Sequence, residues 1–374
     1  MRSLLKRFTN ARLRAQIVKE LLSILRDPRS RVVVFVPPLM QLLIFAFATT
    51  LEVRNVDIAV HDRDAGHWSH EFVARVATAE FVNKVRTVHS RDELRALIDE
   101  RKVIAGLDLA PNFSRDIAAG GTGTAQVIVD GRRSNAGQIT VGYLNAIAAD
   151  VGAAARPDTR NASPVVVRNW FNPNLIYRWF VVPALSGILV FFSALMITAL
   201  SIARERELGT FDQLLVSPTT TLEIIVAKTV PALAIGAALG LMMIAAAAFL
   251  FRVPFEGSFL LLLPSVLLFI LSVVGIGLMV SSVSATQRQA ILGTFAIGVP
   301  AVLMSGFATP VENMPTVLQW MAQAIPLKHF LVIVEGTFLK AMPAADIIAN
   351  TWPLAAIALV TLTMATVFVR SRLG

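Results

Sequence analysis

The side chains best placed to do chemistry lie in one charged stretch, RERELGTFDQLLVSP, at Arg204–Pro218 between two long apolar segments. Its first four residues alternate in sign, from Arg204 and Glu205 to Arg206 and Glu207. Alternating charges can pair with charges on a protein partner, so the chemistry that we expect here is docking. We expect no catalytic residue and no metal site in the chain.

An apolar stripe accompanies these charges. If residues 205–215 are helical, Leu208, Phe211 and Leu215 share one face while the polar side chains point elsewhere. Pro218 ends the segment, and Thr220 with Glu223 forms a capping box that opens the next apolar run. A short amphipathic helix of this kind could dock into a cleft of a partner. Alternatively, the stretch is only a solvated loop near lipid.

The composition indicates a membrane protein. Of 374 residues, 55 % are hydrophobic and 16 % are charged, and the mean hydropathy is +0.65. The net charge of +9 does not indicate nucleic acid, because nine Lys or Arg residues against two acidic ones precede the first apolar run, within residues 1–31. Such a flank favours the inner side of a membrane. The chain has no cysteine, which excludes disulfides and thiolate metal sites.

Six apolar segments are long enough to cross a bilayer as helices, which takes about 20 residues. They span approximately Val32–Leu51, Tyr177–Ile202, Val226–Phe251, Phe259–Val283, Ala290–Phe307 and Ile347–Val369. The fold class is therefore a polytopic α-helical membrane protein with six transmembrane helices. Six crossings that start inside also end inside, so we expect both termini in the cytoplasm.

The first 31 residues contain apolar residues at helical spacing between Leu4 and Leu25, with cations between them. This pattern favours an amphipathic helix lying in the cytoplasmic interface of the membrane. A disordered basic tail that only fixes the topology is the alternative.

Residues 52–175, between the first two spans, alternate strand-like and helix-like stretches. One of the helices opens with a capping box, Ser90 to Glu93. This alternation predicts a small extracytoplasmic α/β domain with about four strands. Residues 176–374 would then hold the remaining five spans.

Lys228 is a charged side chain within a predicted span, about two turns or less from its inner end. We expect it to extend to the interface, as long cationic side chains do near helix ends. An ion or proton site is the less favoured alternative.

Three stretches carry a family pattern: RERELGTFDQLLVSPTTTLEIIVAK, SSVSATQRQA, and MSGFATPVENMPTVLQWMAQAIPLKHFLVIVEGTFLK. Together they resemble the type 2 ABC exporter permeases. The resemblance covers the chain from about Tyr177 to its end, and the preceding parts fit the longer bacterial subgroup of the family. One departure is Glu335, where relatives often have a basic residue.

The resemblance implies a coupling helix at 204–217 and an outer re-entrant segment at 307–346. The residues that would couple the chain to an ATPase are Arg204, Glu205, Arg206, Glu207, Leu208, Gly209, Thr210, Phe211 and Leu215. The second and fifth spans would line the substrate path, where each candidate could equally serve helix packing: Phe192, Ser193, Met196, Thr294 and Phe295.

The family also implies partners. The chain has no G-x-x-x-x-G-K-[ST] motif, so we expect no bound cofactor, with ATP and magnesium held by a separate ATPase subunit. A second permease copy or a paralogue would complete the complex, and a periplasmic adaptor could join it. The expected function is export of amphipathic compounds such as drugs across a bacterial inner membrane. The alternative is a membrane-anchored receptor or scaffold whose external domain binds a ligand without transport.

Overall fold

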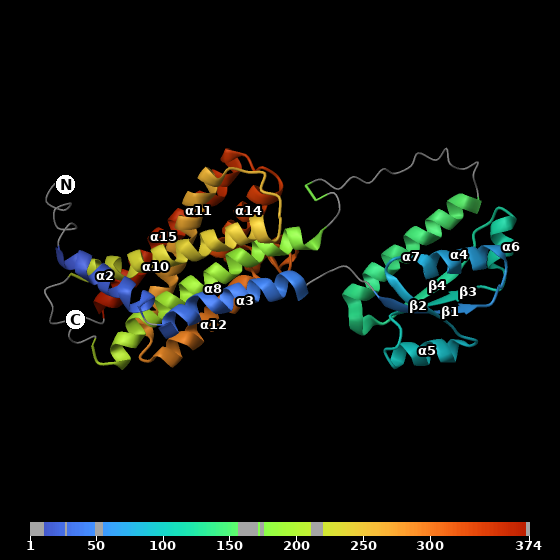
Figure 1. Cartoon of the computed structure of the whole chain (residues 1–374), viewed down its shortest axis with the longest axis horizontal. Coiled ribbons are helices and arrows are strands. Elements are labelled where there is room, and N and C mark those ends of the chain that lie inside the picture. Colours follow the sequence, from blue (N-terminus) through green and yellow to red (C-terminus); the bar gives the residue numbers. More distant parts are fainter. Residues whose placement is uncertain are drawn as a thin grey trace. The chain divides into compact units, whose positions relative to one another are not determined.

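The structure, a computed structural model, describes residues 11–26, 28–48, 55–155, 171–172, 176–210 and 220–371. The chain divides into two compact units (Figure 1). One is helical and consists of Met1–Thr49 with Asn169–Gly374, and the other is Thr50–Arg168.

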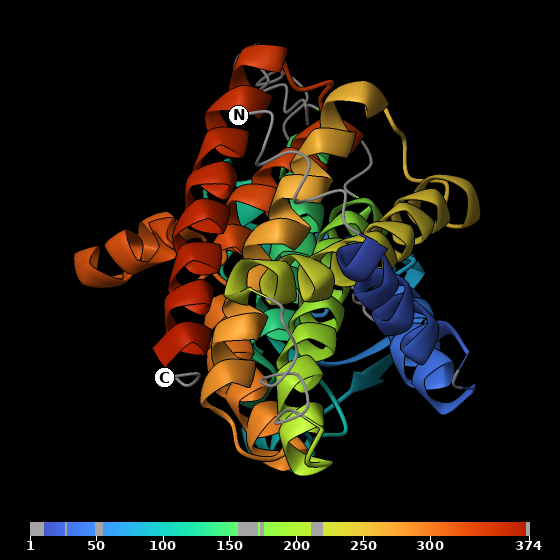
Figure 2. The ribbon, with the colours of Figure 1, turned by 90° about the vertical axis from the view of Figure 1, so that its left-hand side faces the viewer.

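The helical unit is a bundle of long apolar helices, joined by shorter ones. Its elements are α2 (Ala11–Leu25), α3 (Pro28–Ala48), α8 (Tyr177–Glu207), α10 (Thr221–Ala245), η3 (Ala246–Leu250), α11 (Phe259–Val283), α12 (Gln287–Leu303), η4 (Val311–Asn313), α13 (Thr316–Gln323), α14 (Pro326–Leu339) and α15 (Ala344–Ser371). Figure 2 shows α15 (red) at one edge of this bundle, and α2 and α3 (blue) at the opposite edge.

Each of the six predicted spans coincides with a helix over most of its length, but the helices differ in length, and the fifth ends at Leu303, before the predicted end at Phe307. Four helices of the described residues are long and apolar enough to cross a membrane: α8, α10 with η3, α11 and α15. Helices α13 and α14 would count as a fifth span if taken together, although they meet at 78°. Helix α12 has 17 residues, and the apolar part of α3 is Phe35–Phe47.

Helix α8 is the centre of the bundle. Within its most apolar stretch, 72 % of the residues are buried, against 22 % for α15. Helix α11 approaches it closely because small residues face each other. A Cβ atom on Gly277 would collide with the Thr198 hydroxyl, and the Ser281 hydroxyl accepts hydrogen bonds from the backbone N–H groups of Ile202 and Ala203. Small residues allow such backbone contact between apolar helices.

The second unit is a four-stranded sheet with helices on both faces. Its elements are β1 (Val56–Asp62), α4 (His67–Thr78), β2 (Val82–Thr87), α5 (Arg91–Asp99), β3 (Ala105–Leu109), α6 (Phe113–Ala118), β4 (Ala125–Val129), η1 (Gly131–Arg133) and α7 (Ser134–Ala155). The strand order is β2-β1-β3-β4. Strand β1 is parallel to both β2 and β3, and β4 is antiparallel to β3.

The two faces of this sheet are covered unequally. Helices α4, α6 and α7 pack on one face, and α5 packs on the other (Figure 1). The Ser90 hydroxyl caps α5 by accepting a hydrogen bond from the Glu93 N–H, as predicted. The Glu93 carboxylate, however, accepts from the His89 N–H rather than from Ser90.

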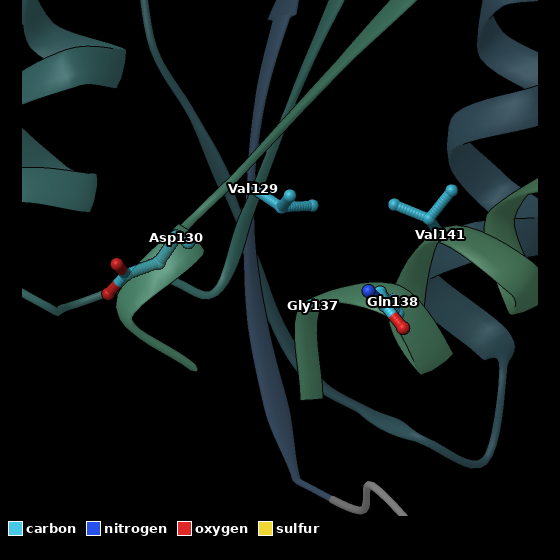
Figure 3. Close-up of a pocket in the computed structure, with 6 residues that line it drawn as sticks. Val129, Asp130, Gly137, Gln138 and Val141 are labelled. Atoms are coloured by element: carbon cyan, nitrogen blue, oxygen red, sulfur yellow. The ribbon is translucent and has the colours of Figure 1, made fainter. Parts of the chain in front are cut away.

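A shallow pocket of about 270 Å³ lies between the end of β4 and α7. Figure 3 shows Val129 and Val141 facing each other across it, while the Asp130 carboxylate points away. Asp130 instead binds Arg132 at 2.8 Å. A binding pocket normally gathers a few convergent polar groups, and this one does not direct its carboxylate inward.

Candidate functional site

The charged stretch begins inside α8 and not in a helix of its own. Helix α8 continues through Glu207, Leu208 caps it, and Gly209 follows with a positive φ of 69°. The prediction of one helix over 205–215 is therefore wrong at its start. Arginine and glutamate are good helix formers, so α8 continues past the last apolar residues until glycine permits the left-handed turn.

Two of these charged residues hold the connection between α11 and α12. The Arg206 guanidinium donates to the carbonyl oxygens of Ser282 at 2.6 Å and Ser284 at 3.2 Å. The Glu207 carboxylate accepts a hydrogen bond of 2.8 Å from the Gln287 N–H at the first turn of α12. A displacement of the end of α8 would therefore be transmitted to α11 and α12.

Glu205 points away from the α11–α12 connection and toward α10, where it lies next to the buried Lys228. The Lys228 Nζ of α10 lies 2.9 Å from a Glu205 carboxylate oxygen and 3.4 Å from one of Glu20 on α2. The Lys228 side chain is only 2 % exposed. The Glu205 oxygen that faces it makes no well-aligned hydrogen bond, so this contact is an ion pair set by charge.

The expectation that Lys228 extends to the interface is wrong. Helix α2 packs on α10 and covers the lysine, and carboxylates from two helices neutralise it. Sequence reasoning missed Glu20 as a partner. The signal was present, because a lysine in an apolar span requires a nearby counter-charge. We name Glu20, Glu205 and Lys228 the buried ion cluster.

Beyond Glu207 the chain presents an apolar side chain to the outside. Leu208 is 63 % exposed, and the Thr210 N–H bonds back to the Glu205 carbonyl oxygen. Phe211 and Leu215, the rest of the predicted stripe, lie outside the described residues. Leu208 is thus exposed next to Glu205, Arg206 and Glu207, whose side chains are held by contacts with α10, α11 and α12. An exposed leucine beside such fixed charges is suited to docking.

The start of α10 follows the sequence pattern closely. The Thr220 hydroxyl accepts from the Glu223 N–H at 3.3 Å, and the Glu223 carboxylate accepts from the Thr220 N–H at 2.8 Å. This is the predicted capping box. It fixes the point at which the chain re-enters the bundle, a few residues before Lys228.

The five candidates for the substrate path lie on α8 and α12, but only some of them meet. The rings of Phe192 and Phe295 are 6.0 Å apart, and Phe295 is half exposed. Ser193 and Thr294 are buried and donate to carbonyl oxygens of their own helices. Met196 is partly buried on α8. The two phenylalanines are therefore the candidates that form a common surface.

Comparison with known proteins identifies the family of the chain. A family model described as "ABC-2 family transporter protein" matches residues 31–367. The probable multidrug ABC transporter permease YbhR of Escherichia coli strain K12 is 41 % identical over 354 residues, which cover 94 % of this chain and 96 % of that protein. The probable multidrug ABC transporter permease YbhS of the same strain is 28 % identical over 352 residues, 91 % of each chain. Its inner membrane transport permease YhhJ is 28 % identical over 326 residues, 85 % of this chain and 86 % of that protein. The chain is therefore a member of the ABC-2 family of transporter proteins.

Proposed function

We propose that this chain is the permease subunit of an ATP-binding cassette exporter that moves amphipathic compounds such as drugs out of the cytoplasm or the inner leaflet. The observation that carries the proposal is the end of α8, where the charges contact α10, α11 and α12 and Leu208 remains exposed. The names of YbhR and YbhS, both probable multidrug ABC transporter permeases, support the same conclusion.

The free energy for transport would come from ATP hydrolysis by a partner subunit. ATP and magnesium would bind a cytoplasmic ATPase subunit that docks at residues 204–217, and we expect no bound cofactor or metal in this chain. A second permease copy or a paralogue completes the complex, and a periplasmic adaptor is a further candidate partner.

The proposed topology has six spans in a bacterial inner membrane, with both termini in the cytoplasm. In addition to the four long helices, α3 and α12 cross the membrane, and α2 lies in the cytoplasmic interface. Helices α13 and α14, bent by 78°, form the outer re-entrant segment within residues 307–346. The unit with the sheet, within residues 52–175, lies outside the membrane.

Cysteine labelling tests this topology cleanly, because the chain has no cysteine of its own. Ala96 of α5 and Leu208 are both exposed. In intact cells, an impermeant thiol reagent should label Ala96→Cys once the outer membrane is permeabilised, and Leu208→Cys only after cell lysis. Labelling of Leu208→Cys but not Ala96→Cys in intact cells would invert the proposed orientation.

Transport itself decides between an exporter and a receptor. Inside-out vesicles that contain this chain and its ATPase should accumulate a fluorescent amphipathic dye when ATP is added. Vesicles with an ATPase that lacks its catalytic base are the control. A receptor that binds a ligand without transport would give equal dye signals in both preparations. We expect Phe192 and Phe295, which meet on α8 and α12, to lie along the dye's path with Ser193, Met196 and Thr294.

A further inference from the structure

A cluster of charged side chains surrounds Asp108 near the ends of β1 and β3. Asp108 and His61 are directly opposite each other in the parallel ladder, and the His61 Nδ1 lies 3.0 Å from the Asp108 carboxylate. The Arg63 guanidinium donates to both carboxylate oxygens at 2.9 and 3.2 Å, and the Arg91 Nε donates at 2.7 Å. One buried carboxylate thus holds two arginines side by side.

The carboxylate of Asp108 is ionised in this setting. Its side chain is 1 % exposed, and burial alone would raise its pKa. The hydrogen bonds and charges of Arg91 and Arg63 outweigh that effect and lower the pKa below the usual value. Two arginine cations against one carboxylate leave the cluster with a net charge of +1.

Both guanidinium groups have hydrogen-bond donors left over. The side chain of Arg91 is 61 % exposed and that of Arg63 is 35 % exposed. Each guanidinium has five N–H donors and directs Nε and Nη2 at Asp108. Across the described ranges, the Nη1 groups of these two arginines make no hydrogen bond to the protein.

The cluster lies where an open α/β sheet usually binds its ligands. The connections that follow β1 and β3 both lead to the face covered by α4 and α6, where the Ser114 hydroxyl of α6 accepts from the Trp68 and Ser69 N–H groups of α4. The opposite face carries α5, and ligands of open α/β sheets bind outside the carboxyl ends of the strands. His61 and Asp108 are next to last in β1 and β3.

The acidic residues at the end of β1 and in the loop after it, Asp62 and Asp64, are engaged elsewhere. Asp62 accepts from the hydroxyl of Ser69 on α4, and Asp64 accepts from the N–H of Ser114 on α6. These helices cover the opposite face of the sheet. The two carboxylates therefore belong to the loop and its packing, and the arginine pair faces solvent on the other side.

We propose that Arg63 and Arg91, held in place by Asp108, form a binding site for an oxyanion, a phosphate or carboxylate group of a ligand. Guanidinium groups bind such oxyanions through charge-assisted hydrogen bonds, and fixing them in advance lowers the entropic cost of binding. The site consists of residues of the second unit alone, whereas the substrate-path candidates and the buried ion cluster belong to the helical unit, so it would add a ligand-binding role to the second unit.

Titration calorimetry with inorganic phosphate tests the site in the full chain, purified in an uncharged maltoside detergent at constant ionic strength. We expect saturable binding, and a loss of affinity of at least tenfold in Arg91→Gln and Arg63→Gln. Arg95→Gln is the matched control, because Arg95 lies on the same helix and its side chain is 82 % exposed. Its affinity should equal that of the unchanged chain. Arg91→Lys keeps the positive charge but loses the paired N–H donors of the guanidinium group. Its affinity for phosphate should therefore lie between those of Arg91→Gln and Arg95→Gln.

Two results would overturn the proposal. One is the absence of saturable phosphate binding, and the other is an equal affinity in Arg91→Gln and Arg95→Gln while all variants elute as folded protein. A second titration identifies the source of the anion. A short-chain phosphatidic acid that binds at least tenfold tighter than methyl phosphate would indicate a lipid headgroup, and equal affinities would indicate a soluble ligand.

Discussion

Replacing Lys228 by methionine is expected to lower the free energy of unfolding by about 3 kcal/mol, the lower end of the range for removing one partner of a buried ion pair. The change would leave Glu205, whose side chain is 13 % exposed, without its nearest cation. The lower end applies because Glu20 is 20 % exposed and can regain water. Denaturant-induced unfolding of the purified chain in detergent measures the effect.

Lys19→Met is the matched control for this change. Lys19 lies 3.9 Å from the same Glu205 carboxylate, but its side chain is 66 % exposed. Exposed ion pairs contribute about 0–1 kcal/mol to stability. The free energy of unfolding of Lys19→Met should therefore be almost that of the unchanged chain. Lys228→Met combined with Glu205→Gln should lose less stability than Lys228→Met alone, because the unpaired charge is gone. Equal losses in Lys228→Met and Lys19→Met would show that the buried ion cluster does not stabilise the bundle.

The parts of the site that the sequence predicted well are those with a local cause. The capping box at Thr220 and Glu223 depends on two residues three positions apart, and the structure has both hydrogen bonds. The succession of strand and helix in residues 55–155 depends on local periodicity in the same way, and the structure has these elements in the order that the pattern indicated.

The errors arose where distant segments meet. Lys228 was expected at the interface, but its environment is set by Glu20, 208 positions away in the chain. Hydropathy placed the end of the second span at Ile202, although the helix continues to Glu207. Hydropathy reports which residues prefer lipid, whereas the helix ends where the backbone permits, here at Gly209. The cluster around Asp108 was missed for the same reason, because it joins three segments.

Truncating the apolar stripe beyond Glu207 is expected to weaken binding of the ATPase subunit at least tenfold. Burying a leucine or phenylalanine contributes about 1.5–3 kcal/mol, and 1.4 kcal/mol corresponds to a factor of ten in affinity. Leu208→Ala and Phe211→Ala should therefore each reduce the amount of ATPase that co-purifies with the chain. Leu222→Ala is the control, because Leu222 is also exposed (48 %) but lies in the first turn of α10, outside the docking segment.

ATP hydrolysis by the ATPase subunit, reconstituted in lipid with this chain and a transported drug, tests directly whether the ATPase docks at residues 204–217. We expect the drug to stimulate hydrolysis with the unchanged chain and with Leu222→Ala. The Leu208→Ala, Phe211→Ala double variant should abolish the stimulation while the chain remains folded in the membrane. Full stimulation with the double variant would show that residues 204–217 are a solvated loop and not the site where the ATPase docks.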